Sequence, residues 1–288
     1  MLSGAHTALV TPFQADGSVD FARLRDLIEA QVAAGIDGIV PVGTTGESPT
    51  LSVDEHSEVI RHTIEAAAGR VKVIAGTGGN STEEALELTR RAKEAGADAT
   101  LQVTPYYNKP SQEGLYRHFS AVADIGLPVV LYNIPGRSGR EIALETVVRL
   151  AEHPSIVAVK EAGGSVDRVS ATVHDCDITV VSGDDSLTLP MMAVGGKGVI
   201  SVASNIIPGD VAAMVHSALD GDWATACGLH DKYWELFRDL FLDTNPIPVK
   251  AAMAMMGLAE EVYRLPICPM ADDLKERLRE TLAKVGLV

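Results

Sequence analysis

Residues 156–161 read IVAVKE, an apolar run that ends in a lysine and a glutamate. A run that is apolar on both faces is typical of a buried strand in a parallel sheet covered by helices. Similar runs recur along the chain, and eight strands are predicted: His6–Pro12, Gly38–Gly43, Val71–Gly76, Ala99–Pro105, Pro128–Asn133, Ile156–Glu161, Ile178–Gly183 and Gly198–Ala203.

Amphipathic stretches with helix start signals separate these runs. Asp20 opens one helical pattern and Ser111 another. Ser52–Glu55 and Ser81–Glu84 each place a glutamate three residues after a serine, which predicts a capping box. Glycines that end helical patterns or follow them closely supply the stop signals, at Gly35, Gly96 and Gly221.

Strict alternation of strand and helix, repeated eight times, favours closure into a (β/α)8 TIM barrel, a fold of ~250 residues. The alternative is an open, doubly wound parallel sheet. We prefer the barrel because no GxGxxG motif follows the first predicted strand and because eight units match its strand count.

The barrel pattern is complete by about Asp220, and the chain then reads as helix only. Helices are predicted at Trp223–Phe241, Val249–Leu258 and Asp272–Val285, with a turn at Thr244–Pro248. We therefore divide the chain into a catalytic barrel domain, residues 1–222, and a C-terminal helical region, residues 223–288. Such an addition to a barrel commonly covers a face or builds an oligomer contact.

The composition excludes several kinds of partner. Lys and Arg number 24 against 39 Asp and Glu in 288 residues, a net charge of −15. This charge repels phosphate backbones and anionic lipids, so neither a nucleic acid nor a membrane partner is expected. No apolar run approaches the roughly 20 residues that span a bilayer, and Met1–Gly4 does not open a secretory signal. Three scattered cysteines (Cys176, Cys227 and Cys268) fit reduced thiols, which indicates a cytoplasmic protein.

The functional residues of a TIM barrel lie at the C-terminal ends of its strands. Lys160 ends a buried strand, where burial disfavours an ammonium and leaves an amine able to attack a carbonyl. The resulting Schiff base would act as an electron sink without a metal. The alternative is a structural lysine paired with a carboxylate of the barrel.

Other strand ends carry side chains suited to the same chemistry. The phenol of Tyr132 can transfer protons, or it can be an ordinary core tyrosine. Thr44 and Thr45, in the turn GTTGES, offer hydroxyl and backbone N–H groups to a carboxylate, although this composition is also that of a plain loop. Arg137 follows a Pro-Gly turn and can bind a second carboxylate, or it can be a surface arginine.

Several other chemistries lack their motifs. GTTGES has no Gly-Lys-Ser/Thr, which disfavours nucleotide binding. The eight histidines form no HExxH pair and no cluster at ligand spacing, so no catalytic metal or other cofactor is expected. Asp184 and Asp185 can bind a cation or make hydrogen bonds at the rim of the barrel, and the sequence leaves this open.

Seven motifs occur in order along nearly the whole chain: GTTGES, TPYYNKPSQEGLYRHF, LYNIPGRSG, VKEAGG, SGDD, GVISVASN and NPIPVK. With them the chain resembles the 4-hydroxy-tetrahydrodipicolinate synthase (dihydrodipicolinate synthase) family, within the Schiff-base lyases and aldolases typified by N-acetylneuraminate lyase. The resemblance implies a barrel with C-terminal helices and a homotetramer built as a dimer of dimers. It also implies the first committed step of diaminopimelate and lysine biosynthesis, the condensation of pyruvate with L-aspartate 4-semialdehyde.

The resemblance also implies roles for individual residues. Lys160 matches the Schiff-base lysine, and Tyr132 matches the proton donor and acceptor, linked through Thr44 to Tyr107 of the partner subunit. The positions that hold pyruvate and the carboxylate of the aldehyde are matched by Thr45, Ile200 and Arg137. Two alternatives stay open: another pyruvate-dependent aldolase or lyase of this superfamily, and a non-catalytic barrel that binds a small carboxylate.

A regulatory site for L-lysine is a further expectation from the resemblance. Family members that L-lysine inhibits bind it at the tight dimer interface, near positions matched here by Ser48, Pro49, His56, Asn80, Glu84 and Tyr106. Sensitive members often carry a histidine in place of Val53 and an alanine in place of Pro49. The alternative is that His56 and Glu84 are solvated residues of helix faces.

Overall fold

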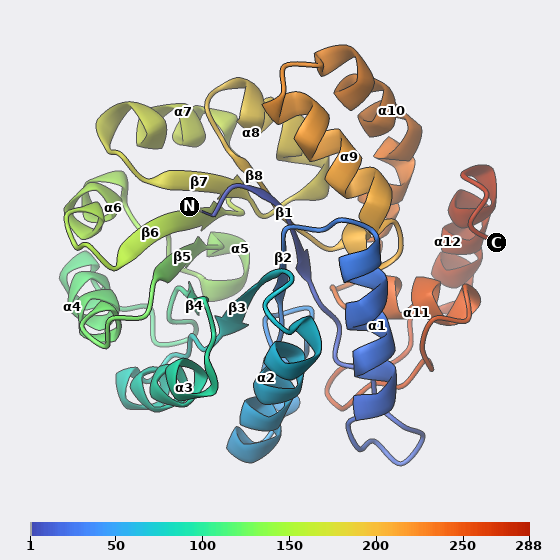
Figure 1. The fold of residues 1–288 in the computed structure, drawn as a ribbon, viewed down its shortest axis with the longest axis horizontal. Coiled ribbons are helices and arrows are strands. Elements are labelled where there is room, and N and C mark those ends of the chain that lie inside the picture. The colour runs from blue at the N-terminus through green and yellow to red at the C-terminus, as the bar shows by residue number, and fades with distance from the viewer. Residues whose placement is uncertain (1) are drawn as a thin grey trace.

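The computed structural model describes residues 2–288, so that Met1, the first residue of the predicted barrel domain, lies outside them. Eight parallel strands form a closed barrel in chain order (Figure 1). The TIM-barrel prediction is therefore confirmed, and the doubly wound alternative is wrong. The strands are β1 (Gly4–Ala8), β2 (Gly38–Val40), β3 (Lys72–Gly76), β4 (Ala99–Val103), β5 (Val129–Asn133), β6 (Ile156–Glu161), β7 (Thr179–Ser182) and β8 (Gly198–Ser201).

The pairing of β1 with β8 closes the barrel, with Gly4 opposite Gly198 and Thr7 opposite Ser201. A Cβ on Gly198 would lie 1.9 Å from the carbonyl oxygen of Gly4, so only glycine fits at this contact. Seven strands lie within their predicted ranges, but the prediction His6–Pro12 for the first strand is wrong. This strand begins at Gly4 and ends at Ala8, because the N–H of Val10 donates to Oδ1 of Asn205 (3.1 Å) and not to a neighbouring strand.

Helices surround the barrel in Figure 1 and cover the outward faces of its strands. They are α1 (Phe21–Ala33), α2 (Val53–Ala67), α3 (Thr82–Ala95), α4 (Gln112–Ala123), the short α5 (Pro135–Ser138), α6 (Leu144–Ala151), α7 (Val166–Asp175), α8 (Thr188–Ala193) and α9 (Pro208–Leu219). Single 3-10 turns at η1 (Ser48–Thr50), η2 (Asp185–Leu187) and η3 (Ala203–Asn205) follow β2, β7 and β8.

One of the two predicted capping boxes forms. At the start of α2, Oγ of Ser52 accepts from the N–H of Glu55 (3.2 Å), whose carboxylate accepts from the N–H of Ser52 (2.9 Å). The box predicted at Ser81 is wrong, because the side chain of Ser81 makes no capping hydrogen bond. The carboxylate of Glu84 lies instead against Gly79, where an added Cβ would be 3.2 Å from it.

Three helices follow the barrel: α10 (Trp223–Asp239), α11 (Ile247–Met255) and α12 (Asp272–Lys284). The helix α10 packs against α9, and α12 packs against α10 and α11 at one side of the molecule (Figure 1). The middle helix begins two residues before its predicted start, inside the segment expected to be a turn. None of the helices in residues 2–288 is both long and apolar enough to cross a membrane.

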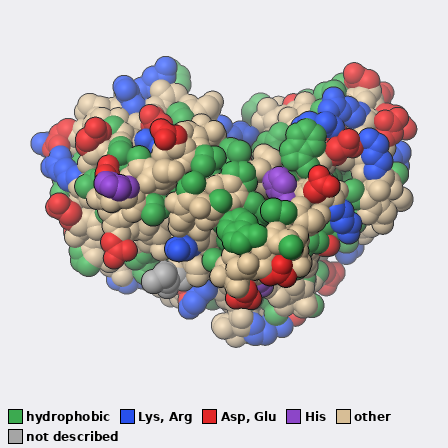
Figure 2. Space-filling view, turned by 90° about the horizontal axis from the view of Figure 1, so that it is seen from above, with side chains coloured by type: hydrophobic (Ala, Val, Ile, Leu, Met, Phe, Trp, Pro, Cys, Tyr) green, Lys and Arg blue, Asp and Glu red, His purple; other side chains and the backbone are tan. Residues whose placement is uncertain are grey.

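A buried carboxylate joins the last helices. The carboxylate of Asp239, only 1% exposed, accepts from Arg238 (2.6 Å), Arg277 (2.9 Å) and Thr281 (2.7 Å). On the face seen in Figure 2, acidic and basic side chains are interspersed, and the outline is indented between two halves.

Candidate active site

A cavity of about 210 Å³ opens at the C-terminal end of the barrel, between the segments that follow β2 to β5. A smaller space of about 40 Å³ lies beside Lys160 and shares part of this lining. Five side chains for which the sequence predicts a catalytic or substrate-binding role line the smaller space together: Thr44, Thr45, Tyr132, Arg137 and Lys160. The strands therefore bring one amine, three hydroxyl groups and a guanidinium to one place.

Lys160 and Tyr132 face each other because β5 and β6 pair them in register. The Nζ atom of Lys160 lies 4.2 Å from the centre of the Tyr132 ring, and the two residues are only 6% and 5% exposed. Lys160 makes no ion pair within 4 Å among the described residues, which argues against a structural lysine held by a carboxylate. The amine is buried, unpaired and beside a phenol.

The two aspartates after β7 have different surroundings. Asp184 lines the space beside Lys160, and burial raises the pKa of its carboxyl while the nearby lysine opposes the rise. Asp185 is buried and accepts from the N–H groups of Val202 (3.1 Å) and Ala203 (3.0 Å). Asp185 therefore makes hydrogen bonds at the rim of the barrel. No group of three His, Cys, Asp or Glu in residues 2–288 could hold a metal ion.

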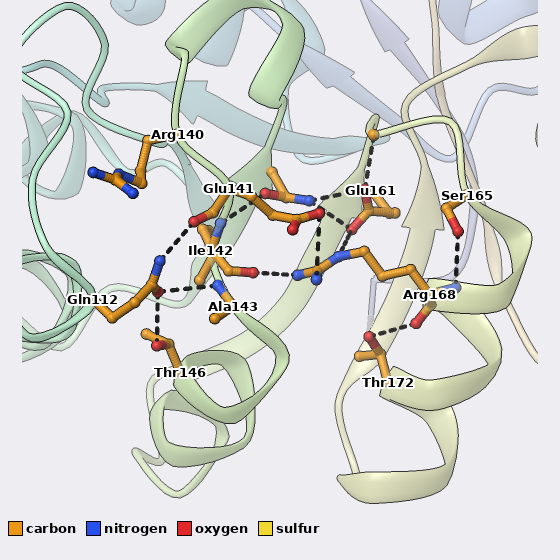
Figure 3. A network of polar contacts seen from close by, with 12 residues as sticks. Gln112, Arg140, Glu141, Ile142, Ala143, Thr146, Glu161, Ser165, Arg168 and Thr172 are labelled. Atoms are coloured by element: carbon orange, nitrogen blue, oxygen red, sulfur yellow. Dashed lines mark hydrogen bonds and ion pairs between the residues drawn. The ribbon is translucent and has the colours of Figure 1, made fainter.

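A polar network outside the barrel holds the ends of β5 and β6 (Figure 3). Asn133 and Glu161 follow Tyr132 and Lys160 and are themselves paired in register, so they point to the opposite side. The amide of Asn133 donates to Glu161 (2.9 Å), whose carboxylate also accepts from Nε of Arg168 on α7 (2.8 Å). The network thus fixes the two strand ends that carry the amine and the phenol.

Asn245, at the start of the NPIPVK motif, was missed as a site residue. Its Nδ2 atom donates to Oγ1 of Thr45 (3.0 Å), and its carbonyl accepts from Arg137 (3.0 Å). Asn245 also lines the space beside Lys160. The sequence signal for this residue was the NPIPVK motif, because Asn245 does not lie at the end of a barrel strand.

Two predicted site residues lie elsewhere. Ile200 is 1% exposed in the barrel interior, in the same apolar cluster as Tyr132, and does not line either space. Tyr107 is 90% exposed and also lies outside both linings. Within one chain, these two side chains are therefore not gathered with the other predicted residues.

A further cavity, of about 80 Å³, adjoins the first. Five of the six residues predicted for an effector site line it: Ser48, Pro49, His56, Glu84 and Tyr106. Asn80 does not, and its carbonyl accepts from Asn108 (2.8 Å). The imidazole of His56 is buried and its Nε2 donates to the carbonyl of Gly76 (2.9 Å), so the solvated alternative is wrong for this residue. Burial lowers the pKa of His56 to about 4.

Comparisons with known proteins agree with this architecture. Residues 1–285 match the model of the dihydrodipicolinate synthetase family. The chain is 49% identical to the 4-hydroxy-tetrahydrodipicolinate synthase of Persephonella marina over 293 residues, covering 100% of both chains. The solved 4-hydroxy-tetrahydrodipicolinate synthase of Methylacidiphilum fumariolicum SolV superimposes with a TM-score of 0.97 at 51% identity, covering 99% of this chain and 96% of that one.

A second solved structure is the dihydrodipicolinate synthase of Cyanidioschyzon merolae with lysine bound. It superimposes with a TM-score of 0.96 at 42% identity, and 99% of each chain is covered. Family match, sequence identity and fold agree over almost the full length. This chain belongs to the dihydrodipicolinate synthetase family.

Proposed function

We propose that this chain is a Schiff-base-forming lyase that condenses pyruvate with L-aspartate 4-semialdehyde. The product would be (4S)-4-hydroxy-2,3,4,5-tetrahydrodipicolinate, at the first committed step of diaminopimelate and lysine biosynthesis. The observation that carries the proposal is the buried, unpaired amine of Lys160 beside the phenol of Tyr132. The name 4-hydroxy-tetrahydrodipicolinate synthase of the relatives supports it.

In this proposal, the neutral amine of Lys160 attacks the ketone of pyruvate and water leaves to give an imine. Tyr132, with Thr44, carries the protons of these steps, and loss of a methyl proton then gives an enamine. The hydroxyl of Thr45 and the N–H groups of its turn bind the pyruvate carboxylate. The lysine itself is the electron sink, so the chemistry needs no cofactor.

The enamine carbon then adds to the aldehyde of the second substrate. Arg137, exposed at the mouth of the cavity, receives the carboxylate of that substrate bidentately. The amine of the new chain attacks the imine carbon, which releases Lys160 and closes the ring. Tyr132, which lies beside the amine, returns its proton.

The test is reduction with borohydride in the presence of pyruvate, followed by mass measurement of the protein. We expect one reduced pyruvyl adduct on Lys160, and no adduct in Lys160→Ala, whose condensation activity should be almost lost while its fold survives. An unmodified wild-type protein would favour the carboxylate-binding barrel. An adduct without condensation of aspartate semialdehyde would favour another pyruvate-dependent aldolase.

Tyr107 is proposed to act in the site of a second subunit. The residue is 90% exposed and holds a positive φ of 71°, a conformation that costs a bulky residue about 1–3 kcal/mol. An exposed, strained aromatic that lies outside the cavities of its own chain fits insertion into a partner. We therefore propose a homotetramer, built as a dimer of dimers. Sedimentation that shows a fully active monomer would contradict this.

L-lysine is proposed to bind the 80 Å³ cavity as an effector. Nε2 of His56 is a donor to Gly76, so the neutral ring presents Nδ1, which is buried and has no partner among the described residues, as an acceptor. Glu84 places a carboxylate in the same lining. An ammonium group would pair with this carboxylate, and the relative from Cyanidioschyzon merolae has lysine bound. Val53 and Pro49 also lie in this lining, where members that L-lysine inhibits often carry a histidine and an alanine. The loss of one polar contact with L-lysine should weaken its binding by ~1 kcal/mol.

The regulatory proposal is tested by initial rates at saturating substrates, with L-lysine up to tens of millimolar. We expect partial inhibition that Glu84→Thr relieves, because the substitution removes the carboxylate that pairs with the ammonium. A flat curve for the wild-type protein would show that the cavity has no regulatory use. Glu83→Thr, on the neighbouring exposed position of α3, is the matched control.

A further inference from the structure

The loop after β2 is tied to α11 by an ion pair that is almost wholly buried. The Nζ atom of Lys250 lies 2.5 Å from Oε1 of Glu47, and the two side chains are 2% and 1% exposed. Glu47 belongs to the GTTGES turn, and Lys250 ends the NPIPVK motif. The pair therefore joins two motifs from opposite ends of the chain.

The two charges are enclosed by residues of the loop after β1 and of the segment after α11. Lys250 donates to the carbonyl of Thr11 (3.3 Å), and its ammonium lies 4.3 Å from the centre of the Phe13 ring. The second carboxylate oxygen of Glu47 accepts from the N–H of Arg264 (3.3 Å). Burial lowers the pKa of Lys250, while the carboxylate of Glu47 opposes this shift.

The backbone of Glu47 is bonded directly to the turn that carries the two threonines. The N–H of Glu47 donates to the carbonyl of Thr44 (3.1 Å), and its φ is +54°, a left-handed conformation that a glutamate holds only at a cost. The preceding Gly46 leaves no room to relax, because an added Cβ would lie 2.8 Å from the nitrogen of Val42. A shift of the Glu47 side chain would therefore move Thr44 and Thr45.

A buried ion pair is weak evidence for stability, because desolvation of both charges offsets their attraction. The same helix motif makes a second contact with this turn, from Asn245 to the hydroxyl of Thr45 (3.0 Å). The ion pair ends on Glu47, in the same turn as Thr44, and the Asn245 contact ends on Thr45 itself. The ion pair and this hydrogen bond together hold the GTTGES turn against the NPIPVK segment.

We propose that Glu47 and Lys250 are positioning residues, which hold Thr44 and Thr45 in place for pyruvate and make α11 part of the catalytic unit. The inference rests on the proposed function of the site. The charges do not contact pyruvate themselves. They act through the backbone of the turn, and a displacement of about 1 Å in such a group can lower a rate by about 10²-fold.

The test compares the double variant Glu47→Gln/Lys250→Met with Asp239→Asn in the full-length protein. Removal of both charges of a buried pair is tolerated far better than removal of one, so the double variant should keep its Tm within about 5 °C. Its kcat/KM for pyruvate should nevertheless fall about 10- to 100-fold. Asp239→Asn weakens a charged cluster around an equally buried carboxylate that does not contact the turn, so Tm should fall while kcat/KM stays within about twofold.

Borohydride trapping at subsaturating pyruvate separates the outcomes. The adduct should form more slowly in the double variant, in parallel with kcat/KM, and at the wild-type rate in Asp239→Asn. Wild-type kinetics in the double variant, or kinetic losses that follow Tm in both variants, would overturn the inference. Absence of the adduct in the wild-type protein would instead overturn the proposed function.

If the double variant does not fold, Glu47→Asp decides the question. This variant keeps both charges of the buried pair but shortens the side chain that links the turn to Lys250. A raised KM for pyruvate with a Tm close to that of Asp239→Asn supports a positioning role. An unchanged KM refutes it.

Discussion

Tyr132 and Lys160 illustrate how a single pair of residues acquires its chemistry from the strands around it. Each follows an apolar strand, and the register of β5 with β6 sets the phenol ring 4.2 Å from the amine. Neither residue is more than 6% exposed, so bulk water is kept from both groups. The phenol is therefore placed beside the amine, where it can carry protons to and from it.

Tyr132→Phe should lower kcat about 10²- to 10⁴-fold, the range for loss of a general acid–base group. The ring keeps its packing, so the free energy of unfolding should change little. Steady-state rates and the rate of adduct formation are the measurements, and Tyr116→Phe on the outer helix α4 is the control. Full activity in Tyr132→Phe would remove this residue from the proton transfer.

The helices and strands were predicted well wherever the hydrophobic pattern of a single segment determines its structure. All eight strands occur in the expected order, because an apolar run bounded by polar residues is a local signal. The first strand was misplaced because Leu9 and Val10 are buried like strand residues but lie beyond the end of β1. The capping box at Ser81 failed because the carboxylate of Glu84 turns toward Gly79.

The candidate site was predictable to the extent that strand ends meet at one rim of a barrel. That rule gathers Lys160, Tyr132 and Arg137 without knowledge of the structure. The rule does not predict Asn245 or Lys250 as site residues, because their contacts join segments about 200 positions apart. The periodicity of the sequence gives no sign of such contacts. A lysine within the otherwise apolar helix α11 was nevertheless a visible sign that this residue has a buried partner.

The polar network outside the barrel, which links β5 and β6 to α7 through Glu161 and Arg168, leads to a prediction about stability. Arg168→Met leaves the carboxylate of Glu161, which is 3% exposed, without its cationic partner. Loss of one member of a buried pair should lower the free energy of unfolding by about 3–5 kcal/mol. Urea denaturation measures the change. Arg117→Met, which removes an exposed pair with Glu113, should have little effect, and equal effects of the two variants would contradict the prediction.

Three histidines in residues 2–288 are buried and kept neutral by burial: His6, His56 and His118. Burial lowers the pKa of each to about 4, below the value of 6.5 for a free histidine. The unfolded chain therefore binds more protons than the folded chain between these values. Stability should fall as the pH drops from about 6.5 toward 4, and each group can contribute up to about 3 kcal/mol to this loss.

Thermal unfolding between pH 7.5 and 4.5 tests this prediction. We expect Tm to fall steadily below pH 6.5 in the wild-type protein. His118→Gln should show a shallower fall, because one proton fewer is taken up on unfolding. His174→Gln, at a side chain that is 86% exposed, should leave the slope unchanged. A Tm independent of pH in this range would contradict the prediction.

The closure of the barrel by β1 and β8 also constrains how the protein can be made. The partner of β1 on one side, Gly198–Ser201, leaves the ribosome only after most of the chain has been synthesised. At ~5–20 residues per second, the delay between the two strands is roughly 10–40 s. During this time one edge of β1 is unpaired, and an unpaired edge can add strands of other chains. Aggregation during synthesis should therefore be most sensitive to translation rate between these two strands.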